Sequence, residues 1–206
     1  MLLELIKPGV FAYDIGANIG TCTQRLIDGG CRVLAVEPQP EMCSEMQKIF
    51  YGNENVTILQ SAVGNKQGIG TLNINSRNTL STMSNQWISK SRFKESKWKT
   101  KIEVPIVTLD SLIDEYGIPD YIKIDVEGWE HKVILGLTKK VPCISFEFVI
   151  EFHQQTINCI NTLKDIGYTE FHFPGFTDWI NSEEIMSKIT YLCSIDNNMW
   201  GDLYAR

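Results

Sequence analysis

Residues 13–21 read YDIGANIGT, the most informative stretch of the sequence. An apolar run precedes it and a helix-like apolar pattern follows it, so the order is strand, tight turn, helix. Such a turn presents backbone N–H groups and a helix N-terminus to a ligand. Gly16 and Gly20 carry no side chain where a ligand would approach the backbone, and Asn18 tolerates a left-handed conformation. We therefore expect Gly16, Ala17, Asn18 and Gly20 to line a cofactor site.

Two acids indicate which cofactor this turn would bind. Asp14 would repel a diphosphate and suits a cationic group, such as the ammonium of S-adenosylmethionine. Glu37 ends the next apolar run, 21 residues after Gly16, close to the spacing at which an acid binds ribose hydroxyls. A ribose without a diphosphate favours S-adenosylmethionine over NAD. The alternative is an ordinary glycine-containing turn with no ligand.

Composition limits the class of protein. The chain has 206 residues, 43% hydrophobic and 21% charged, which is typical of one soluble domain. Its net charge of −6 argues against a broad nucleic-acid-binding surface. Six cysteines without metal-like spacing, and no signal-peptide pattern, predict reduced thiols and a cytoplasmic protein. No apolar run is long enough to cross a membrane.

Strand-like and helix-like patterns alternate along the chain, which is typical of an α/β fold. We expect strands at residues 11–16, 31–37, 56–63, 69–75, 102–109, 121–126, 143–149, 168–173 and 199–205. We expect helices at residues 18–28, 40–51, 110–116, 129–137 and 156–166, and a short one near 183–188 within an otherwise irregular segment, 176–198. In a doubly wound sheet, Ser61 and Ala62 would then lie beside an adenine pocket.

An insertion at residues 76–101 differs from the rest of the chain. It carries seven basic residues against one acid, together with Trp87, Phe93 and Trp98. One interpretation is a lid that stacks on an anionic or sugar-like acceptor. The other is a solvated basic segment whose tryptophans pack into the core.

A second informative stretch, DYIKIDVEGWE, spans residues 120–130. Period-two alternation puts Lys123 and Asp125 on one side of a strand and the isoleucines on the other. These charges fall at the carboxyl end of the strand, where open α/β sheets place their sites. Glu147 would face the same cleft from a neighbouring strand. A structural ion pair of Lys123 with Asp125 or Glu147 is the alternative interpretation.

With both stretches placed, the chain resembles the FkbM family of S-adenosylmethionine-dependent methyltransferases. The resemblance rests on five segments, which span residues 8 to about 150: PG…YDIGANIG at 8–20, VEP at 36–38, AVG at 62–64, VTLD at 107–110 and YIKIDVEGWE at 121–130. The last third of the chain matches more loosely.

The resemblance implies a class I methyltransferase fold: a doubly wound, mostly parallel seven-stranded sheet with an antiparallel last strand. It implies a single domain over residues 1–206 and O-methylation of a small molecule or saccharide. By motif position it places Asp14, Gly16, Asn18 and Glu37 at the cofactor, and we expect the adjoining Pro38 to lie there too. It places Asp125 and Glu127 at the cleft where the methyl donor meets the acceptor.

Removing the proton of an acceptor hydroxyl needs a base or a metal ion. We expect Asp125 or Glu127 to be the base or acceptor-orienting group, with Lys123 or His131 tuning its charge. A competing hypothesis is Mg²⁺ or Ca²⁺ held by Asp125, Glu127 and Glu147, because carboxylate oxygens suit these ions.

Two other functions stay open from the sequence. An RNA or cap methyltransferase would use the basic insertion to contact nucleic acid, which the acidic overall charge disfavours. A non-catalytic domain would bind the cofactor without turnover. An NAD-dependent oxidoreductase is disfavoured by Asp14 and by the absence of a middle glycine.

Overall fold

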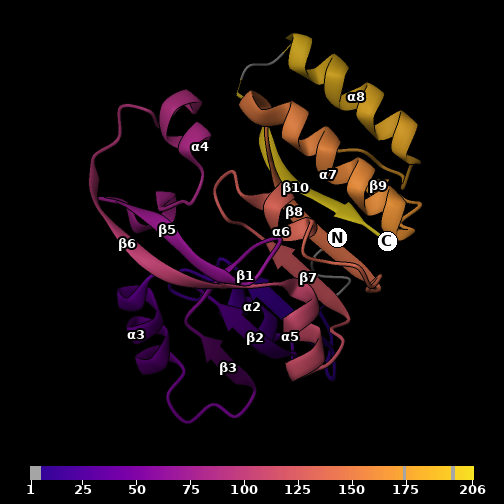
Figure 1. The fold of residues 1–206 in the computed structure, drawn as a ribbon. Coiled ribbons are helices and arrows are strands. Elements are labelled where there is room, and N and C mark those ends of the chain that lie inside the picture. The colour runs from indigo at the N-terminus through magenta and orange to yellow at the C-terminus, as the bar shows by residue number, and fades with distance from the viewer. Residues whose placement is uncertain (1–5, 174, 196–197) are drawn as a thin grey trace.

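A computed structural model of the chain describes residues 6–173, 175–195 and 198–206. Its centre is a seven-stranded sheet with the strand order β3-β2-β1-β7-β8-β10-β9 (Figure 1). The strands of this sheet are β1 (Phe11–Ile15), β2 (Arg32–Val36), β3 (Val56–Leu59), β7 (Tyr121–Ile124), β8 (Cys143–Val149), β9 (Phe171–His172) and β10 (Trp200–Ala205).

The strand directions match the expected fold class. Strands β3, β2, β1, β7 and β8 pair in parallel, whereas β10 runs antiparallel to both of its neighbours, β8 and β9. Parallel strands place their carboxyl ends at one edge, so β1, β2 and β7 end side by side. The predicted mostly parallel sheet with an antiparallel last strand is confirmed.

Helices cover both faces of this sheet. The helices within the described residues are α2 (Thr21–Asp28), α3 (Pro40–Ile49), α4 (Asn85–Lys90), α5 (Leu109–Tyr116), α6 (Glu130–Ile134), α7 (His153–Ile166) and α8 (Ser182–Ile195), with 3₁₀ turns η1 (Asn78–Leu80) and η2 (Ile150–Phe152). Within the described residues, no helix is both long and apolar enough to span a membrane.

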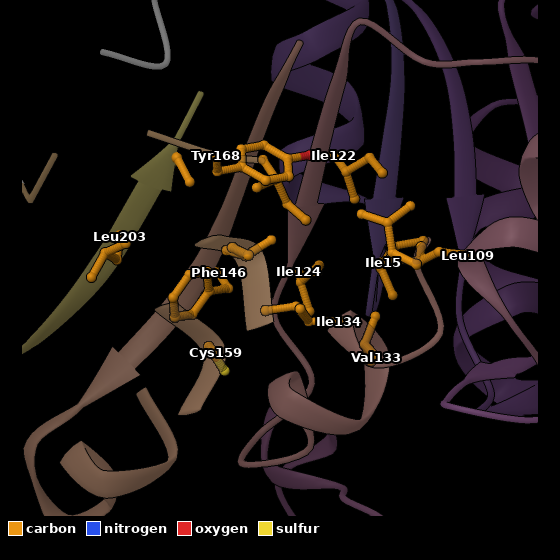
Figure 2. Packing of buried hydrophobic residues seen from close by; sticks show 14 of the residues in the cluster. Ile15, Leu109, Ile122, Ile124, Val133, Ile134, Phe146, Cys159, Tyr168 and Leu203 are labelled. Carbon is orange, nitrogen blue, oxygen red and sulfur yellow. The ribbon is translucent and has the colours of Figure 1, made fainter. Parts of the chain in front are cut away.

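The largest core lies between the sheet and helices α5 to α8. Ile122, Ile124 and Phe146 of the central strands belong to one cluster with Val133 of α6 and Cys159 of α7, as Figure 2 shows. All five side chains are buried. Helices α2 and α3 cover the opposite face in two smaller clusters. The chain is therefore layered, with the carboxyl edge of the strands left for a site.

The prediction of one strand over residues 56–63 is wrong, because the segment forms two strands. It splits into β3 in the large sheet and β4 (Ala62–Val63), which pairs with β6 (Trp98–Val107) in a three-stranded sheet, β4-β6-β5. Strand β5 (Gly68–Asn75) is the third member and runs antiparallel to β6, as expected for 69–75 and 102–109. Ser61 lies at the break, where its hydroxyl bonds Pro105 O at 3.0 Å. Pairing with β6, which is distant in sequence, divides the apolar run.

The C-terminal region is more regular than expected. Segment 176–198, apart from residues 196 and 197, which lie outside the described residues, contains the 14-residue helix α8 instead of a short helix. Ile185 and Ile189, one turn apart, are its buried anchors. The Asn181 side chain caps its first turn by accepting the N–H of Glu184 at 2.9 Å. The strand expected at 168–173 is only the two residues of β9.

The insertion packs against the body of the protein. It contains η1, α4 and the start of β6, which lie beyond the edge of the large sheet in Figure 1. Trp87 of α4 is only 1% exposed and stacks on Phe152, with ring centroids 5.4 Å apart. The interpretation of Trp87 as an aromatic platform for an acceptor is therefore wrong, because the ring fills a core.

Candidate active site

One cavity opens at the carboxyl edge of the sheet. It contains about 690 Å³ of space between atoms, including its open mouth. Strand ends, the turn after β1 and the insertion all contribute to its wall, which is lined by Ile15, Gly16, Asn18, Val36, Glu37, Pro38, Gln39, Ser61, Ala62, Val63, Leu72, Asn78, Thr79, Ser81, Thr82, Met83, Asp125, Val126, Glu127 and Trp129. Eight of the residues expected at the site from sequence are in this wall: Gly16, Asn18, Glu37, Pro38, Ser61, Ala62, Asp125 and Glu127.

Glu37 is the acid at the end of β2, and its carboxylate is fixed by peptide groups. Its Oε2 accepts the N–H of Asn18 at 2.9 Å, and its Oε1 accepts the N–H of Gln39 at 2.9 Å. Burial raises the pKa of Glu37, and the hydrogen bonds from Gln39 and Asn18 oppose that rise. Because Oε2 receives a single hydrogen bond, it keeps capacity to accept a hydroxyl from the cavity.

The turn after β1 has the strained backbone that its sequence predicts. Gly16 has φ +83°, and Asn18 has φ +51°, the left-handed conformation expected for Asn at this position. A Cβ on Gly16 would stand 1.9 Å from the carbonyl oxygen of Asp125. Gly16 therefore permits the close approach of β1 and the end of β7, in addition to lining the cavity.

Three cofactor-site expectations on this turn differ from the structure. Asp14 is 1% exposed and does not line the cavity; its Oδ2 accepts the Thr23 hydroxyl at 2.6 Å. Side-chain alternation turns Asp14 to the face covered by α2, so it lies beneath the turn and not at its mouth. Ala17 and Gly20 face α3: Ala17 packs there, and a Cβ on Gly20 would meet Phe50 at 2.5 Å.

Lys123 and Asp125 form the ion pair that the sequence left as an alternative. Lys123 Nζ lies 2.7 Å from Asp125 Oδ2, with side-chain exposures of 12% and 38%. Burial would lower the pKa of Lys123, but the carboxylates of Asp125 and Asp14 outweigh it and raise that pKa above its ordinary value. Lys123 is absent from the cavity wall, whereas its ion-pair partner Asp125 is part of that wall.

Glu127 and Glu147 complete a group of acids around Asp125. One carboxylate oxygen from each of the three lies within 4.8 Å of the others. Burial and, to a smaller extent, repulsion from Asp125 raise the pKa of Glu127 well above its usual range and the pKa of Glu147 to about 10. Glu147 Oε2 is buried without a hydrogen-bond partner among the described residues. Glu147 does not line the cavity that contains Asp125 and Glu127 but lines a second pocket next to Glu130. The group can bind a proton, or a cation in its place.

His131 lies away from the other candidates. Its Nε2 is 3.2 Å from the hydroxyl of Thr162 on α7, and it is not part of the cavity wall. Burial lowers its pKa. The position four residues after Glu127 turns the imidazole toward α7, so the structure does not bring it to the acids.

Sequence reasoning missed the polar residues that join the insertion to the cavity. Gln39 Nε2 donates to Glu37 Oε1 at 3.1 Å and to Asn78 O at 3.0 Å, while its Oε1 accepts the Ser81 hydroxyl at 2.8 Å. Thr82 Oγ1 donates to Glu127 O at 2.7 Å. Only the position of Gln39, two residues after Glu37, could have indicated one of these contacts from sequence.

The cavity wall has an acidic character. Among the described residues that line it, Glu37, Asp125 and Glu127 carry carboxylates, and none is Lys or Arg. Of the insertion's basic residues, Arg92 instead pairs with Glu151, at 2.7 Å from Nε to Oε1. The basic side chains expected to meet an anionic acceptor therefore do not reach this cavity.

Comparisons with known proteins bear on the family and the fold of the chain. A family model described as "Methyltransferase FkbM domain" matches residues 14–182. Similar solved structures include precorrin-6y C5,15-methyltransferase from Geobacter metallireducens GS-15, with TM-score 0.51, 12% identity and coverage of 99% of this chain and 84% of that one. Aeropyrum pernix fibrillarin, solved with natively bound S-adenosyl-L-methionine, has TM-score 0.53, 12% identity and coverage of 98% and 68%. At this identity the two structures establish the fold alone. A search among curated protein sequences finds no match.

Proposed function

The chain belongs to the FkbM methyltransferase family and so to the S-adenosylmethionine-dependent methyltransferases, and on this premise we propose that it methylates a hydroxyl group of a small molecule or saccharide. The observation that carries the proposal is the placement of Glu37 and the Asp125–Glu127 pair in the wall of one cavity. We also propose that residues 1–206 act as one domain, because the described elements pack around a single large sheet with the insertion beside it.

The cofactor half of the cavity fits S-adenosylmethionine. Glu37 would accept the ribose hydroxyls through the free capacity of Oε2. Pro38, Ser61 and Ala62 offer a small and largely apolar wall for adenine, and Gly16 with Asn18 offers backbone for the amino-acid end. When bound, the cofactor supplies an electrophilic methyl group on a sulfonium.

The acceptor half of the cavity has the residues that deprotonation requires. We assign the base to Glu127, because it lines the cavity beside Asp125 and its raised pKa makes it a stronger base than an ordinary carboxylate. Asp125 would orient the acceptor, and Lys123 would balance its charge at 2.7 Å. The acidic wall favours a neutral or cationic hydroxyl compound over an anionic one, which also argues against RNA.

A divalent ion remains the competing source of activation. The carboxylate oxygens of Asp125, Glu127 and Glu147 lie close enough together to share one ion, and hard oxygen ligands suit Mg²⁺ or Ca²⁺. In that case the three acids would hold the ion, which would supply Lewis-acid polarisation of an oxygen bound there. The two hypotheses require the same residues and differ in their response to chelation.

The test is a screen for methyl transfer from S-adenosylmethionine to hydroxyl compounds, beginning with neutral saccharides and amino sugars. We expect Asp125→Asn and Glu127→Gln each to lower the rate about 100-fold or more while leaving affinity for S-adenosylhomocysteine intact. Asp114→Asn is the matched control, since Asp114 is exposed on α5 and forms an ion pair with Lys139. Full activity in both active-site variants would refute the assignment. Full activity after EDTA treatment would reject the metal hypothesis.

A further inference from the structure

The backbone of Glu127 is held in an unusual conformation. Among the described residues, only two that are not glycine have φ in the left-handed region, Asn18 at +51° and Glu127 at +54°. Both line the cavity. Asn adopts this conformation readily, whereas a residue such as Glu is strained in it. Such a conformation persists only where the surrounding contacts impose it.

Thr82, in the insertion, supplies one of those contacts. Its hydroxyl donates to the carbonyl oxygen of Glu127 at 2.7 Å and accepts the N–H of Ser84 at 2.8 Å. The backbone of Thr82 is in turn fixed to Asn73 on β5 by two hydrogen bonds, of 2.9 and 3.1 Å. The oxygen of the Thr82 hydroxyl accepts the Ser84 N–H, and the carbonyl oxygen of Glu127 can only accept a hydrogen bond. The hydroxyl proton of Thr82 therefore points at Glu127 O.

Glu130 and Trp87 hold the same turn from other directions. Glu130 Oε1 accepts the N–H of Val126 at 3.2 Å and the N–H of Gly128 at 3.1 Å. The Trp87 ring lies against Gly128, where a Cβ would stand 2.8 Å from it. The N–H groups of the turn are therefore bound on one side, and its carbonyl at Glu127 is bound on the other.

We propose that Thr82 is a positioning residue that sets the direction of the Glu127 side chain toward the acceptor. The inference rests on the proposed function, because it takes Glu127 as the group that receives the acceptor's proton. Without the hydroxyl, the carbonyl of Glu127 loses its partner, and the peptide unit after Glu127 is held only through the Gly128 N–H on Glu130, which lets it rotate toward a less strained conformation. The carboxylate then leaves the productive direction, while the cofactor half around Glu37 is unchanged.

Two substitutions at Thr82 separate this role from simple packing. Thr82→Val keeps the shape and removes the hydroxyl, whereas Thr82→Ser keeps the hydroxyl. Thr100→Val is the matched control, since Thr100 is exposed on β6. We expect Thr82→Val to lower kcat about tenfold or more with the KM for S-adenosylmethionine within about twofold, and Thr82→Ser to recover most of kcat. A wild-type kcat in Thr82→Val, or equal losses in Thr82→Val and Thr82→Ser, would overturn the inference.

Hydrogen exchange distinguishes a failure of this inference from a failure of the proposed function. We expect peptides covering residues 121–130 to exchange faster in Thr82→Val than in wild type, Thr82→Ser or Thr100→Val. If wild type turns over no acceptor but this pattern holds, the proposed function fails and the restraint on the turn stands. Unchanged exchange in Thr82→Val would overturn the restraint itself, whatever the activity.

Discussion

The carboxylate of Glu37 accepts the backbone N–H of Asn18 at 2.9 Å, and this contact joins the end of β2 to the turn after β1. The glycine-containing turn and the acid at the end of β2, which both indicated a cofactor from sequence, are thus joined by a hydrogen bond. Because the N–H of Gln39 holds the other oxygen, the carboxylate is oriented before any ligand arrives. Preorganisation of this kind lowers the cost of binding.

Gly16→Ala should destabilise the protein far more than glycine replacement at an open position. Gly16 combines φ +83° with a Cβ position 1.9 Å from Asp125 O, whereas Gly52 has φ +74° with no atom within 4 Å. Both variants pay the left-handed strain, and only Gly16→Ala adds a backbone clash. We expect a difference of about 2 kcal/mol or more in the free energy of unfolding, measured with urea. Equal losses would mean that the approach of β1 to Asp125 does not require glycine.

Trp87→Ala tests whether the insertion is packed or free. The ring is 1% exposed, so we expect a loss of about 3–5 kcal/mol in the free energy of unfolding. Trp200→Ala, at a ring that is 68% exposed, should change stability by only about 0.5 kcal/mol. Thermal and urea unfolding provide the comparison. An unchanged stability in Trp87→Ala, with a raised KM for the acceptor, would return Trp87 to the role of a stacking platform.

Glu130→Gln should remove part of the pH dependence of stability. Burial raises the pKa of Glu130 to about 7, so between its ordinary value and this one the native state keeps a proton that the unfolded state releases. The free energy of unfolding therefore falls as pH rises through this window, by at most about 1.4 kcal/mol per pH unit. The Gln oxygen still accepts the N–H groups of Val126 and Gly128, so the turn is retained.

Urea unfolding of wild type and Glu130→Gln across this pH window measures the effect. The stability difference should move in favour of the variant as pH rises, and Glu95→Gln, at an exposed acid of the insertion, should follow wild type. Parallel curves for wild type and Glu130→Gln would show that Glu130 does not hold the extra proton. The difference between the curves reports Glu130 together with its repulsion of Glu127 and Glu147, because burial and, to a smaller extent, neighbouring carboxylates including Glu130 raise the pKa of both.

Local patterns in the sequence predicted the centre of the fold well. Alternation over residues 121–126 put Lys123 and Asp125 opposite Ile122 and Ile124, and the structure has the isoleucines fully buried and the charges paired. Alternation depends only on neighbouring residues in the chain, which is why a sequence can reveal it.

The features that the sequence did not predict depend on distant contacts. Strand β4 is separated from β3 because β6, some forty residues later, pairs with Ala62 and Val63. Asp14 is buried because Thr23 of α2 meets it, and no pattern around Asp14 signals that partner. The contact of Thr82 with Glu127 joins residues 45 positions apart.

Calorimetric titration with S-adenosylhomocysteine tests whether the cavity beside Glu37 binds S-adenosylmethionine, as we propose. We predict that wild type binds S-adenosylhomocysteine with micromolar affinity and does not bind NAD. The affinity of Glu37→Ala should be lower than that of wild type by a factor of about ten or more, because a charge-assisted hydrogen bond contributes about 1.5–3 kcal/mol. Glu41→Ala, at an exposed acid of α3, should bind as wild type does. Absence of S-adenosylhomocysteine binding by wild type, or equal affinity in Glu37→Ala, would contradict the claim.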